Sequence, residues 1–359
     1  MDENSIFNDQ NLNNLEFLFN YAETFQFGQV HIDIEKNTRA IIIIAIHNTK
    51  LGPALGGCRF IEYTSRGAAI IDALRLARGM SYKAAIAGLP LGGGKAVIIK
   101  PPGSIDREAI FSRFGQLINN LNGQYITAKD SGSEMSDMDV IARHTPYVTT
   151  TTSTSESIGD PSYFTARGVL RSIEASVSHR LNKSSLADIH VAIQGAGAVA
   201  KFLAKELVAR GARISVCDVD STRASEFSKQ FNATVVDPSA IYDVDCDVFS
   251  PCALGATINH ATIPRIKAKI IAGCANNQLE RRECGIELHR REIIYAPDYL
   301  ANSGGLIFAA SEYFKNNQNT VIAKVDEIHD TLLQIYQRSA EQNEASNVIT
   351  GKLVEEMIY

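Results

Sequence analysis

Long hydrophobic runs, clusters of basic residues and closely spaced cysteines are all missing from this chain of 359 residues. The longest uninterrupted apolar run, residues 40–46, is far shorter than the ~20 residues that span a membrane. The N-terminus carries Asp2 and Glu3 and has no apolar core, so we expect no signal peptide. The net charge is −5 and no run of lysine or arginine occurs, which argues against a nucleic-acid-binding surface. We therefore expect a cytoplasmic protein with no nucleic-acid and no membrane partner.

The cysteines also exclude one class of site. The six residues, at positions 58, 217, 246, 252, 274 and 284, include no CxxC pair. No group of Cys and His has the spacing of zinc ligands, so a metal site is not expected. Thiols scattered through apolar segments are typical of reduced, mostly buried cysteines in a cytosolic protein. The composition, 45% hydrophobic and 21% charged, is that of an ordinary globular protein.

The length and the pattern of the first half predict an α/β domain. Single cores rarely grow past ~250–300 residues, so we expect two domains. Isoleucine-rich segments at 29–34 and 39–46 indicate strands, and apolar residues at helical spacing indicate a helix over 68–83. Further elements are expected as a strand at 96–99, a helix at 106–121, a strand at 125–128 and a helix at 136–144. The alternation predicts largely buried strands in a domain over residues 1–149.

A polar run, TTTTSTSES at residues 149–157, interrupts this pattern. We place the inter-domain crossing near residue 150, although a surface loop is the alternative. A helix from 164 to about 180 then begins a second domain, over residues 150–320. In the last segment, 321–359, apolar residues recur at helical spacing, which predicts a helix packed against the body of the protein. The first domain is one candidate surface for that packing.

Two lysines, Lys83 and Lys95, lie in a stretch that has no acidic side chain from residue 80 to residue 100. Lys95 belongs to LGGGKA at 91–96, where three glycines let the backbone approach a ligand and adopt φ > 0. Burial among small apolar neighbours and a second ammonium group would both lower the pKa of a lysine here. One lysine can then act as a base while the other holds an anion. A glycine turn with a solvated lysine is the alternative, whereas a P-loop is excluded by the motif's composition.

A dinucleotide-binding motif opens the second domain. A strand at 189–194 leads directly into GAGAVA at 195–200, and a helix over 198–210 precedes a second strand at 213–216. The glycines make the tight turn and let the pyrophosphate approach the helix N-terminus, and Asp218 would accept hydrogen bonds from the adenosine ribose. A carboxylate there repels a 2′-phosphate, so the motif predicts a Rossmann domain that binds NAD in preference to NADP. The predicted contacts are Gly195, Gly197, Ala198, Val199 and Asp218.

Loops after the later strands supply further candidates. Strands are expected at 234–236, 248–249, 269–272 and 293–295, and each is followed by a polar or glycine-bearing loop. Ligands of open parallel sheets lie at the carboxyl ends of the strands, so these loops should line the cofactor crevice. The asparagines could hydrogen-bond the nicotinamide ribose or carboxamide, and each could instead be a turn residue. The candidates are Ala253, Asn276, Asn277 and Asn302.

Several motifs occur in one order along nearly the whole chain: LGPALGG, YKAA, LGGGKA, YITAKD, the Rossmann motif, PCALG and NSGG. Together they resemble the glutamate/leucine/phenylalanine/valine dehydrogenases, and most of all the leucine dehydrogenase branch. The resemblance implies reversible oxidative deamination of an L-amino acid to a 2-oxo acid and ammonia, coupled to NAD. It also implies a homo-oligomer whose N-terminal α/β domain binds substrate, performs catalysis and mediates oligomerisation, separated by a cleft from the Rossmann domain.

The same resemblance implies roles for single residues. Lys83 would bind the substrate carboxylate, Lys95 would be the base, and Asp130 would contact the amino group or assist proton transfer. Loss of hydride from Cα gives an iminium, and a nearby base can activate the water that attacks it and relay protons as ammonia leaves. The remaining implied contacts are Gly56 and Gly57 to the substrate and Thr165 to the nicotinamide.

The expected side-chain pocket is apolar, with walls formed by Leu55, Ala128, Leu306 and Ala309. Such a pocket selects an uncharged side chain and rejects glutamate. Two departures from the leucine dehydrogenase pattern lie nearby: Lys129 replaces a glutamate, and Phe308 and Ala309 replace an Asn-Val pair. Alanine in place of valine enlarges the pocket, which is worth ~1–3 kcal/mol in discrimination. Phe308 could refill that space or stack on an aromatic substrate.

Three functions are therefore compared. The leading interpretation is an enzyme acting on an apolar, branched-chain L-amino acid, and the alternative is an aromatic L-amino-acid dehydrogenase. A weakly catalytic NAD-binding regulator is a third possibility, against which the presence of Lys83, Lys95 and Asp130 argues. Steady NADH formation with a panel of amino acids separates the enzymes from the regulator.

Overall fold

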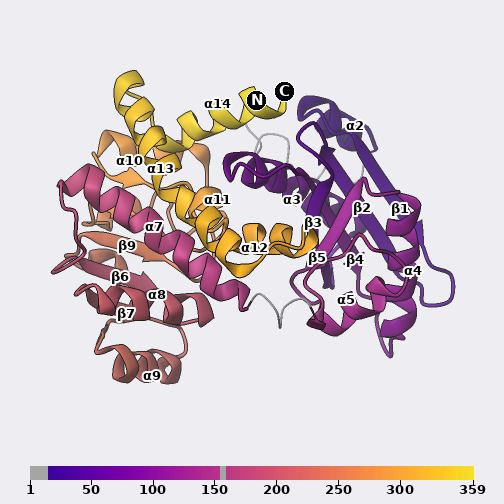
Figure 1. The fold of residues 1–359 in the computed structure, drawn as a ribbon, viewed down its shortest axis with the longest axis horizontal. Coiled ribbons are helices and arrows are strands. Elements are labelled where there is room, and N and C mark those ends of the chain that lie inside the picture. The colour runs from indigo at the N-terminus through magenta and orange to yellow at the C-terminus, as the bar shows by residue number, and fades with distance from the viewer. Residues whose placement is uncertain (1–14, 154–158) are drawn as a thin grey trace. The chain divides into compact units, whose positions relative to one another are not determined.

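The computed structural model describes residues 15–153 and 159–359. Contacts within the chain define two compact units, each built around one sheet (Figure 1). The first unit comprises residues up to 158 together with 309–315 and 357–359, and the second comprises 159–308 and 316–356. Residues 154–158, which include the end of the polar run, lie outside the described residues. In the described ranges, no helix is long and apolar enough to cross a membrane.

The first unit contains a mixed five-stranded sheet in the order β1-β2-β4-β3-β5. β2 pairs antiparallel with β1 and β4, whereas β3 pairs parallel with β4 and β5. The buried run of β-branched residues in β2 explains its place inside the sheet. The predicted strands are confirmed, and β3 is an addition to them. The bounds are β1 Gln29–Ile34, β2 Ile41–Asn48, β3 Ala54–Ile61, β4 Gly92–Ile99 and β5 Tyr125–Lys129.

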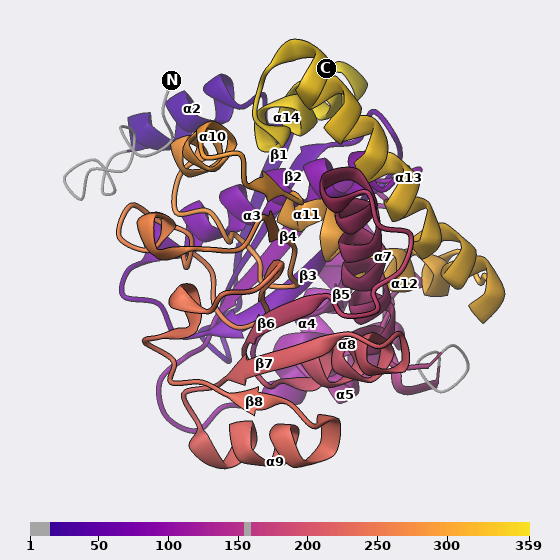
Figure 2. The same cartoon turned by 90° about the vertical axis from the view of Figure 1, so that its left-hand side faces the viewer.

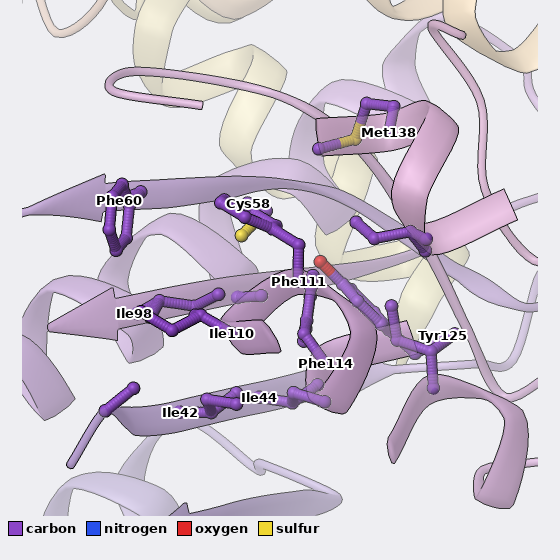
Figure 3. Close-up of a cluster of buried hydrophobic side chains, with 14 of the residues drawn as sticks. Ile42, Ile44, Cys58, Phe60, Ile98, Ile110, Phe111, Phe114, Tyr125 and Met138 are labelled. Carbon is purple, nitrogen blue, oxygen red and sulfur yellow. The ribbon is translucent and has the colours of Figure 1, made fainter. Parts of the chain in front are cut away.

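Helices of the first unit begin at side-chain caps and pack on this sheet. Ser65 Oγ accepts a hydrogen bond from the amide of Ala68 and starts α3, and Asp106 caps α4 in the same way. On one side of the sheet, Phe111 and Phe114 of α4 pack among strand residues in the cluster drawn in Figure 3. On the other side, α3 contributes its own apolar face to a second cluster. The bounds are α2 Leu15–Thr24, α3 Arg66–Ile86, α4 Arg107–Asn120 and α5 Met135–Ala142.

The second unit contains a parallel six-stranded sheet in the order β11-β10-β9-β6-β7-β8. Its first strand, β6, lies inside the sheet, with later strands added first on one side and then on the other. This is the strand order of a Rossmann domain, whose ligand site lies where the order reverses, here between β6 and β9. The predicted Rossmann domain is confirmed. The bounds are β6 His190–Gln194, β7 Arg213–Cys217, β8 Thr234–Val235, β9 Val248–Pro251, β10 Ile270–Ile271 and β11 Ile294–Tyr295.

Helices surround this sheet, with α8 and α9 following β6 and β7 (Figure 2). The apolar stripe of α13 packs on α7, where Tyr336 and Ser176 hydroxyls lie 2.8 Å apart. The predicted C-terminal helix therefore packs within the second unit, and only the last three residues belong to the first unit. The bounds are α7 Pro161–Leu181, α8 Ala198–Ala209, α9 Ser221–Phe231, α10 Arg282–Arg290, α11 Asp298–Ala301, α12 Gly304–Tyr313, α13 Gln318–Gln342 and α14 Ser346–Ile358.

The glycine run of LGGGKA differs from its prediction. Gly92, Gly93 and Gly94 begin strand β4, and none of them has the positive φ that was expected. A Cβ on Gly94 would lie 2.7 Å from the ring of Tyr125, and one on Gly93 would overlap the backbone of Ser81 in α3. Glycine is therefore needed at these positions because the helix and the strands approach closely, which local sequence does not reveal.

Candidate active site

Strand register brings Lys95 and Asp130 together. Lys95 lies on β4 and Asp130 directly follows β5, and β3 lies between these strands. The register of β3 with its two neighbours places Gly57 beside both Lys95 and Ala128. A Cβ on Gly57 would lie 2.7 Å from Cβ of Asp130, so glycine leaves the space in which the two charged side chains meet. Lys95 Nζ donates a hydrogen bond to Asp130 Oδ2.

This ion pair is largely removed from solvent. Only 6% of Lys95 is exposed, and Asp130 is half-buried. Burial acts to raise the pKa of Asp130, but the Lys95 ammonium and the Ser131 amide outweigh it, so the pKa lies below its ordinary value. The carboxylate is thus held in its charged form, in contact with the lysine ammonium. Such a pair can exchange a proton with a substrate bound beside it.

Two residues that the sequence reading missed support Asp130. Ser133 Oγ accepts a hydrogen bond from the Asp130 amide at 2.9 Å and donates to the Cys58 carbonyl at 2.8 Å. Arg59 Nε lies 3.8 Å from Asp130 Oδ2 while its guanidinium donates to Asp72 at 2.7 Å. The sequence could have revealed Arg59, because side chains two residues apart on a strand point to the same face. Arg59 therefore shares a face of β3 with Gly57.

Lys83 lies on the helix that precedes β4. It is half-buried on α3, which packs along β4. The two elements are in close contact at Ser81 and Gly93, where a Cβ on Gly93 would overlap the Ser81 backbone. The two predicted lysines therefore lie on a helix and a strand that pack against each other. Within this contact, Ser81 Oγ hydrogen-bonds Nδ1 of the buried His47 at 2.8 Å.

The predicted pocket residues are all buried, but they are divided between the two units. Leu55, Ala128 and Ala309 belong to the first unit, and Leu306 belongs to the second. The carbonyl of Ala309 lies 3.0 Å from Thr149 Oγ1, which is also 2.7 Å from the buried carboxylate of Glu312. These contacts fix the backbone at Ala309.

The structure shows where the residues that depart from the leucine dehydrogenase pattern lie. Phe308 is fully buried and stacks on Phe164 with the ring centroids 5.4 Å apart. Its ring is therefore engaged inside the second unit, and the idea that it stacks on an aromatic substrate is not supported. Lys129 is exposed, the expected fate of a charged side chain.

The glycine turn after β6 has the geometry of a pyrophosphate site. Gly195 has φ +104°, and a Cβ on it would lie 2.9 Å from Cβ of Ala253. Gly197 begins α8, and a Cβ there would meet nothing within 4 Å, so the helix N-terminus is open to an anion. Ala198 and Val199 form the exposed and half-buried first turn of this helix.

Asp218 is connected to that turn. Its Oδ2 accepts a hydrogen bond from the Ala196 amide at 2.8 Å, and its Oδ1 accepts one from the Asp220 amide at 2.9 Å. The carboxylate therefore orders the glycine turn in addition to the predicted contact with ribose. It is half-buried at the end of β7, where a ribose would lie.

Among the asparagine candidates, Asn302 stands out. It is buried, its Nδ2 donates to Asn276 Oδ1 at 2.7 Å and to the Cys274 carbonyl at 3.1 Å, and its Oδ1 has no partner in the described part of the chain. A buried acceptor without a donor is costly and suits a ligand amide. Asn277, in contrast, adopts φ +50° and its carbonyl accepts from the Ala256 amide, which is the turn role.

Thr165 lies with this group in the second unit. It is half-buried on α7, its Oγ1 donates to the Pro161 carbonyl at 3.0 Å, and a Cβ on Gly305 would be 3.0 Å from it. The hydroxyl is thus next to the NSGG turn that carries Asn302. The open helix N-terminus and the unpartnered Asn302 oxygen together fit a dinucleotide.

Comparison with known proteins identifies the family. Residues 26–147 match the Glu/Leu/Phe/Val dehydrogenase dimerisation domain, and residues 216–354 match the Glutamate/Leucine/Phenylalanine/Valine dehydrogenase domain. The chain is 44% identical to a leucine dehydrogenase of Bacillus cereus, covering 95% of this chain and 93% of the relative. It is 42% identical to an L-tryptophan dehydrogenase of Nostoc punctiforme, covering 95% and 96%.

A solved structure agrees with these matches. The crystal structure of L-tryptophan dehydrogenase from Nostoc punctiforme superposes with a TM-score of 0.85 at 39% sequence identity, covering 95% of this chain and 98% of that one. The similarity extends over both matched regions and over the Rossmann motif between them. The chain belongs to the glutamate/leucine/phenylalanine/valine dehydrogenase family of amino-acid dehydrogenases.

Proposed function

We propose that the protein catalyses the NAD-dependent, reversible oxidative deamination of an apolar, branched-chain L-amino acid to its 2-oxo acid and ammonia. The observation that carries the proposal is the buried Lys95–Asp130 pair, formed over Gly57, with Lys83 on the helix that packs against the strand of Lys95. An ion pair with a purely structural role would not require a second lysine, Lys83, on the helix that packs against β4. The four residues together provide a cation for a carboxylate and a proton-transfer pair for an amino carbon.

Each side chain then has a defined task. Lys83 binds the substrate carboxylate and fixes the orientation of Cα. When bound, NAD accepts the hydride that leaves this carbon. The Lys95 amine removes a proton from the water that attacks the resulting iminium carbon and returns it to the departing nitrogen. Asp130 accepts the hydrogen bond of the Lys95 ammonium and so stabilises the lysine each time it carries the proton.

Asp218 supports the choice of NAD over NADP. Its two oxygens are held by the Ala196 and Asp220 amides, so the carboxylate cannot easily turn away from a ligand at the end of β7. A fixed negative charge there repels a 2′-phosphate and accepts hydrogen bonds from ribose hydroxyls. Contacts to the rest of the cofactor are proposed for Gly195, Gly197, Ala198, Val199, Ala253, Thr165, Asn277 and Asn302.

The preference for an apolar substrate rests on the pocket residues. Leu55, Ala128, Leu306 and Ala309 are all apolar, and a buried apolar wall penalises a charged side chain. The leucine dehydrogenase relative supports a branched-chain substrate. The tryptophan dehydrogenase relative supports the aromatic alternative, but the engagement of Phe308 with Phe164 removes the aromatic side chain that favoured it.

We also propose that the protein is a cytoplasmic homo-oligomer. The dimerisation domain matched by residues 26–147 supports self-association. Strand β1 is at the edge of its sheet and exposes Ile32 and Ile34 by 51% and 63%, an apolar edge that a second strand could cover. The six free cysteines are consistent with a reducing compartment.

A substrate panel tests the proposal. Purified protein is mixed with NAD and, in turn, leucine, valine, isoleucine, phenylalanine, tryptophan or glutamate, and NADH formation is followed. The highest kcat/KM is expected for a branched-chain amino acid. Glutamate as the best substrate would contradict the apolar pocket, and NAD binding without turnover of any amino acid would favour a regulator.

A further inference from the structure

Two cysteines lie in the neighbouring loops that follow β9 and β10. The register of these parallel strands pairs Ile270 with Val248 and Ile271 with Phe249; Cys252 directly follows β9, and Cys274 lies in the loop after β10. Backbone hydrogen bonds continue past the strand ends, from the Ala275 amide to the Pro251 carbonyl at 2.9 Å. Neighbouring strands are ~4.8 Å apart, within the ~4.4–6.8 Å that separates Cα atoms joined through a disulfide.

The side chains of this pair also meet. Cys274 Sγ lies 3.8 Å from the Cys252 carbonyl oxygen, and each thiol shifts the pKa of the other. Ser250 Oγ lies 3.4 Å from Cys252 Sγ. Both cysteines are partly exposed, so a small oxidant can reach them, whereas Cys58, Cys217 and Cys284 are buried.

The two thiols are chemically unequal. Hydrogen bonds from Cys274 and Ser250 lower the pKa of the Cys252 thiol and outweigh the partial burial that acts to raise it. The pKa of the Cys274 thiol is raised by the same hydrogen bond and by burial. In the reaction proposed below, Cys252 attacks the oxidant and Cys274 resolves the product. In the described ranges no three His, Cys, Asp or Glu side chains gather as metal ligands, so a metal does not explain the pair.

The pair lies within the framework of the proposed cofactor site. The Cys252 amide donates to the Gln194 carbonyl at 2.8 Å, directly before the Gly195 turn, and the next residue, Ala253, packs against that turn. On the other side, the Cys274 carbonyl accepts from Asn302 Nδ2 at 3.1 Å. Any movement of the two cysteines therefore moves the glycine turn and Asn302.

We propose that Cys252 and Cys274 form a reversible disulfide, with a peroxide as oxidant, that closes the cofactor site of the second unit. The closure rests on the proposed function, because it requires that NAD bind at these loops. Joining the sulfurs draws the Cβ atoms to ~3.8 Å, closer than the strand spacing, and pulls the loops of Ala253 and Cys274 together. The oxidised enzyme would then bind NAD poorly, and reduction would restore it.

The chemistry balances with hydrogen peroxide. The Cys252 thiolate attacks one peroxide oxygen, the O–O bond breaks, and a sulfenic acid and hydroxide form; the hydroxide takes up the proton that the thiol released. The Cys274 thiol then attacks the sulfenic sulfur, the S–S bond forms and water leaves. Two thiols lose two electrons in total, and one peroxide becomes two waters. A dithiol reductant reverses the reaction by exchange.

The test uses the full-length protein, oxidised with a small excess of hydrogen peroxide and compared with the reduced form. Peptide mapping without reduction identifies the disulfide, and calorimetry measures NAD affinity. Cys274→Ser removes the resolving thiol, and Cys246→Ser is the matched control, because Cys246 is a partly exposed cysteine before the other end of β9. The wild type and Cys246→Ser should form the disulfide and lose affinity by about tenfold or more, ~1.4 kcal/mol, reversed by dithiothreitol. Oxidised Cys274→Ser should keep its affinity.

Three results would overturn the proposal. The first is oxidation of Cys252 or Cys274 only to sulfinic or sulfonic acids. The second is a mapped disulfide with unchanged NAD affinity, and the third is equal loss of affinity in oxidised Cys274→Ser. Failure of the proposed function would give a different result from failure of the disulfide proposal. The reduced wild type would then bind no NAD, while the disulfide could still be mapped.

Discussion

At the scale of single residues, the site depends on the lack of a side chain at Gly57 of β3. Gly57 has no side chain, so Lys95 and Asp130 can meet across the strand between them. The sequence resemblance assigned Gly57 to substrate approach, and the structure gives it a second reason that is internal to the sheet. Arg59 then adds a second cation near Asp130. The carboxylate is thereby kept charged, as its lowered pKa indicates.

Lys83→Ala tests the proposed carboxylate contact. Loss of a charge-assisted hydrogen bond costs ~1.5–3 kcal/mol, so KM for the amino acid should rise by about tenfold or more while kcat changes less. Steady-state kinetics measure both parameters. Lys50→Ala, which removes an exposed lysine of the same unit, is the control and should leave KM unchanged. An unaltered KM in Lys83→Ala would reassign this lysine to structure.

Asp218→Asn tests the cofactor assignment. The amide oxygen can still accept one backbone hydrogen bond and so retain the glycine turn, but the negative charge is gone. The ratio of kcat/KM for NAD to that for NADP should therefore fall, since the 2′-phosphate is no longer repelled. If the wild type already prefers NADP, the role given to Asp218 is incorrect.

Sequence reading found Lys95, Asp130 and the glycine turn because each belongs to a short motif. The sequence did not predict roles for Arg59, Ser133 and Glu312, because their partners come from distant segments that only the fold brings near. Phe308 was misread for the same reason: its stacking partner, Phe164, is remote in the sequence.

At the scale of elements, β4 shows most clearly how local rules fail. Three consecutive glycines favour a loop, yet they form a strand because β2, β3 and α3 surround them. The strand β3 itself was not predicted, since LGPALGG has the glycine and proline content of a turn. In contrast, β6, α8 and β7 were predicted closely, because a strand, glycine turn and helix are consecutive in the chain.

Gly94→Ala tests this packing. The added methyl would lie 2.7 Å from the buried Tyr125 ring, and overpacking of this kind costs ~1–3 kcal/mol. The free energy of unfolding from urea titration should fall accordingly. Gly79→Ala on α3 is the control, because its Cβ meets nothing within 4 Å and alanine favours a helix by ~1 kcal/mol. Equal stability of wild type and Gly94→Ala would contradict the close approach.

His47 links β2 to α3 and predicts a pH dependence of stability. Burial lowers its pKa from 6.5 to about 4, so the folded protein keeps the ring neutral while the unfolded chain takes up a proton. The stabilisation is complete above pH 6.5 and is lost as the pH falls from 6.5 towards 4, by up to ~3 kcal/mol. In His47→Asn, the unfolding free energy should change less between pH 7 and pH 5 than in the wild type. An identical change in both proteins would show that His47 does not contribute.

At the scale of the whole molecule, the two units carry different parts of the proposed reaction. The first unit has the lysine pair and Asp130, and the second has the glycine turn, Asp218 and Asn302. NAD binding should therefore depend on the second unit, whereas turnover requires residues from both. The second unit was the easier to predict, because its parallel strands follow one another with short connections, whereas the first sheet mixes strand directions.

The most direct test of the central claim is the turnover of Lys95→Ala, measured together with its NAD affinity. Loss of a general base costs ~10²–10⁴-fold in rate, so kcat for the preferred amino acid should fall by that factor. NAD affinity should stay that of the wild type, because the role proposed for Lys95 is at the amino-acid carbon and the residue lies in the first unit. Turnover close to that of the wild type would contradict the assignment of Lys95 as the catalytic base.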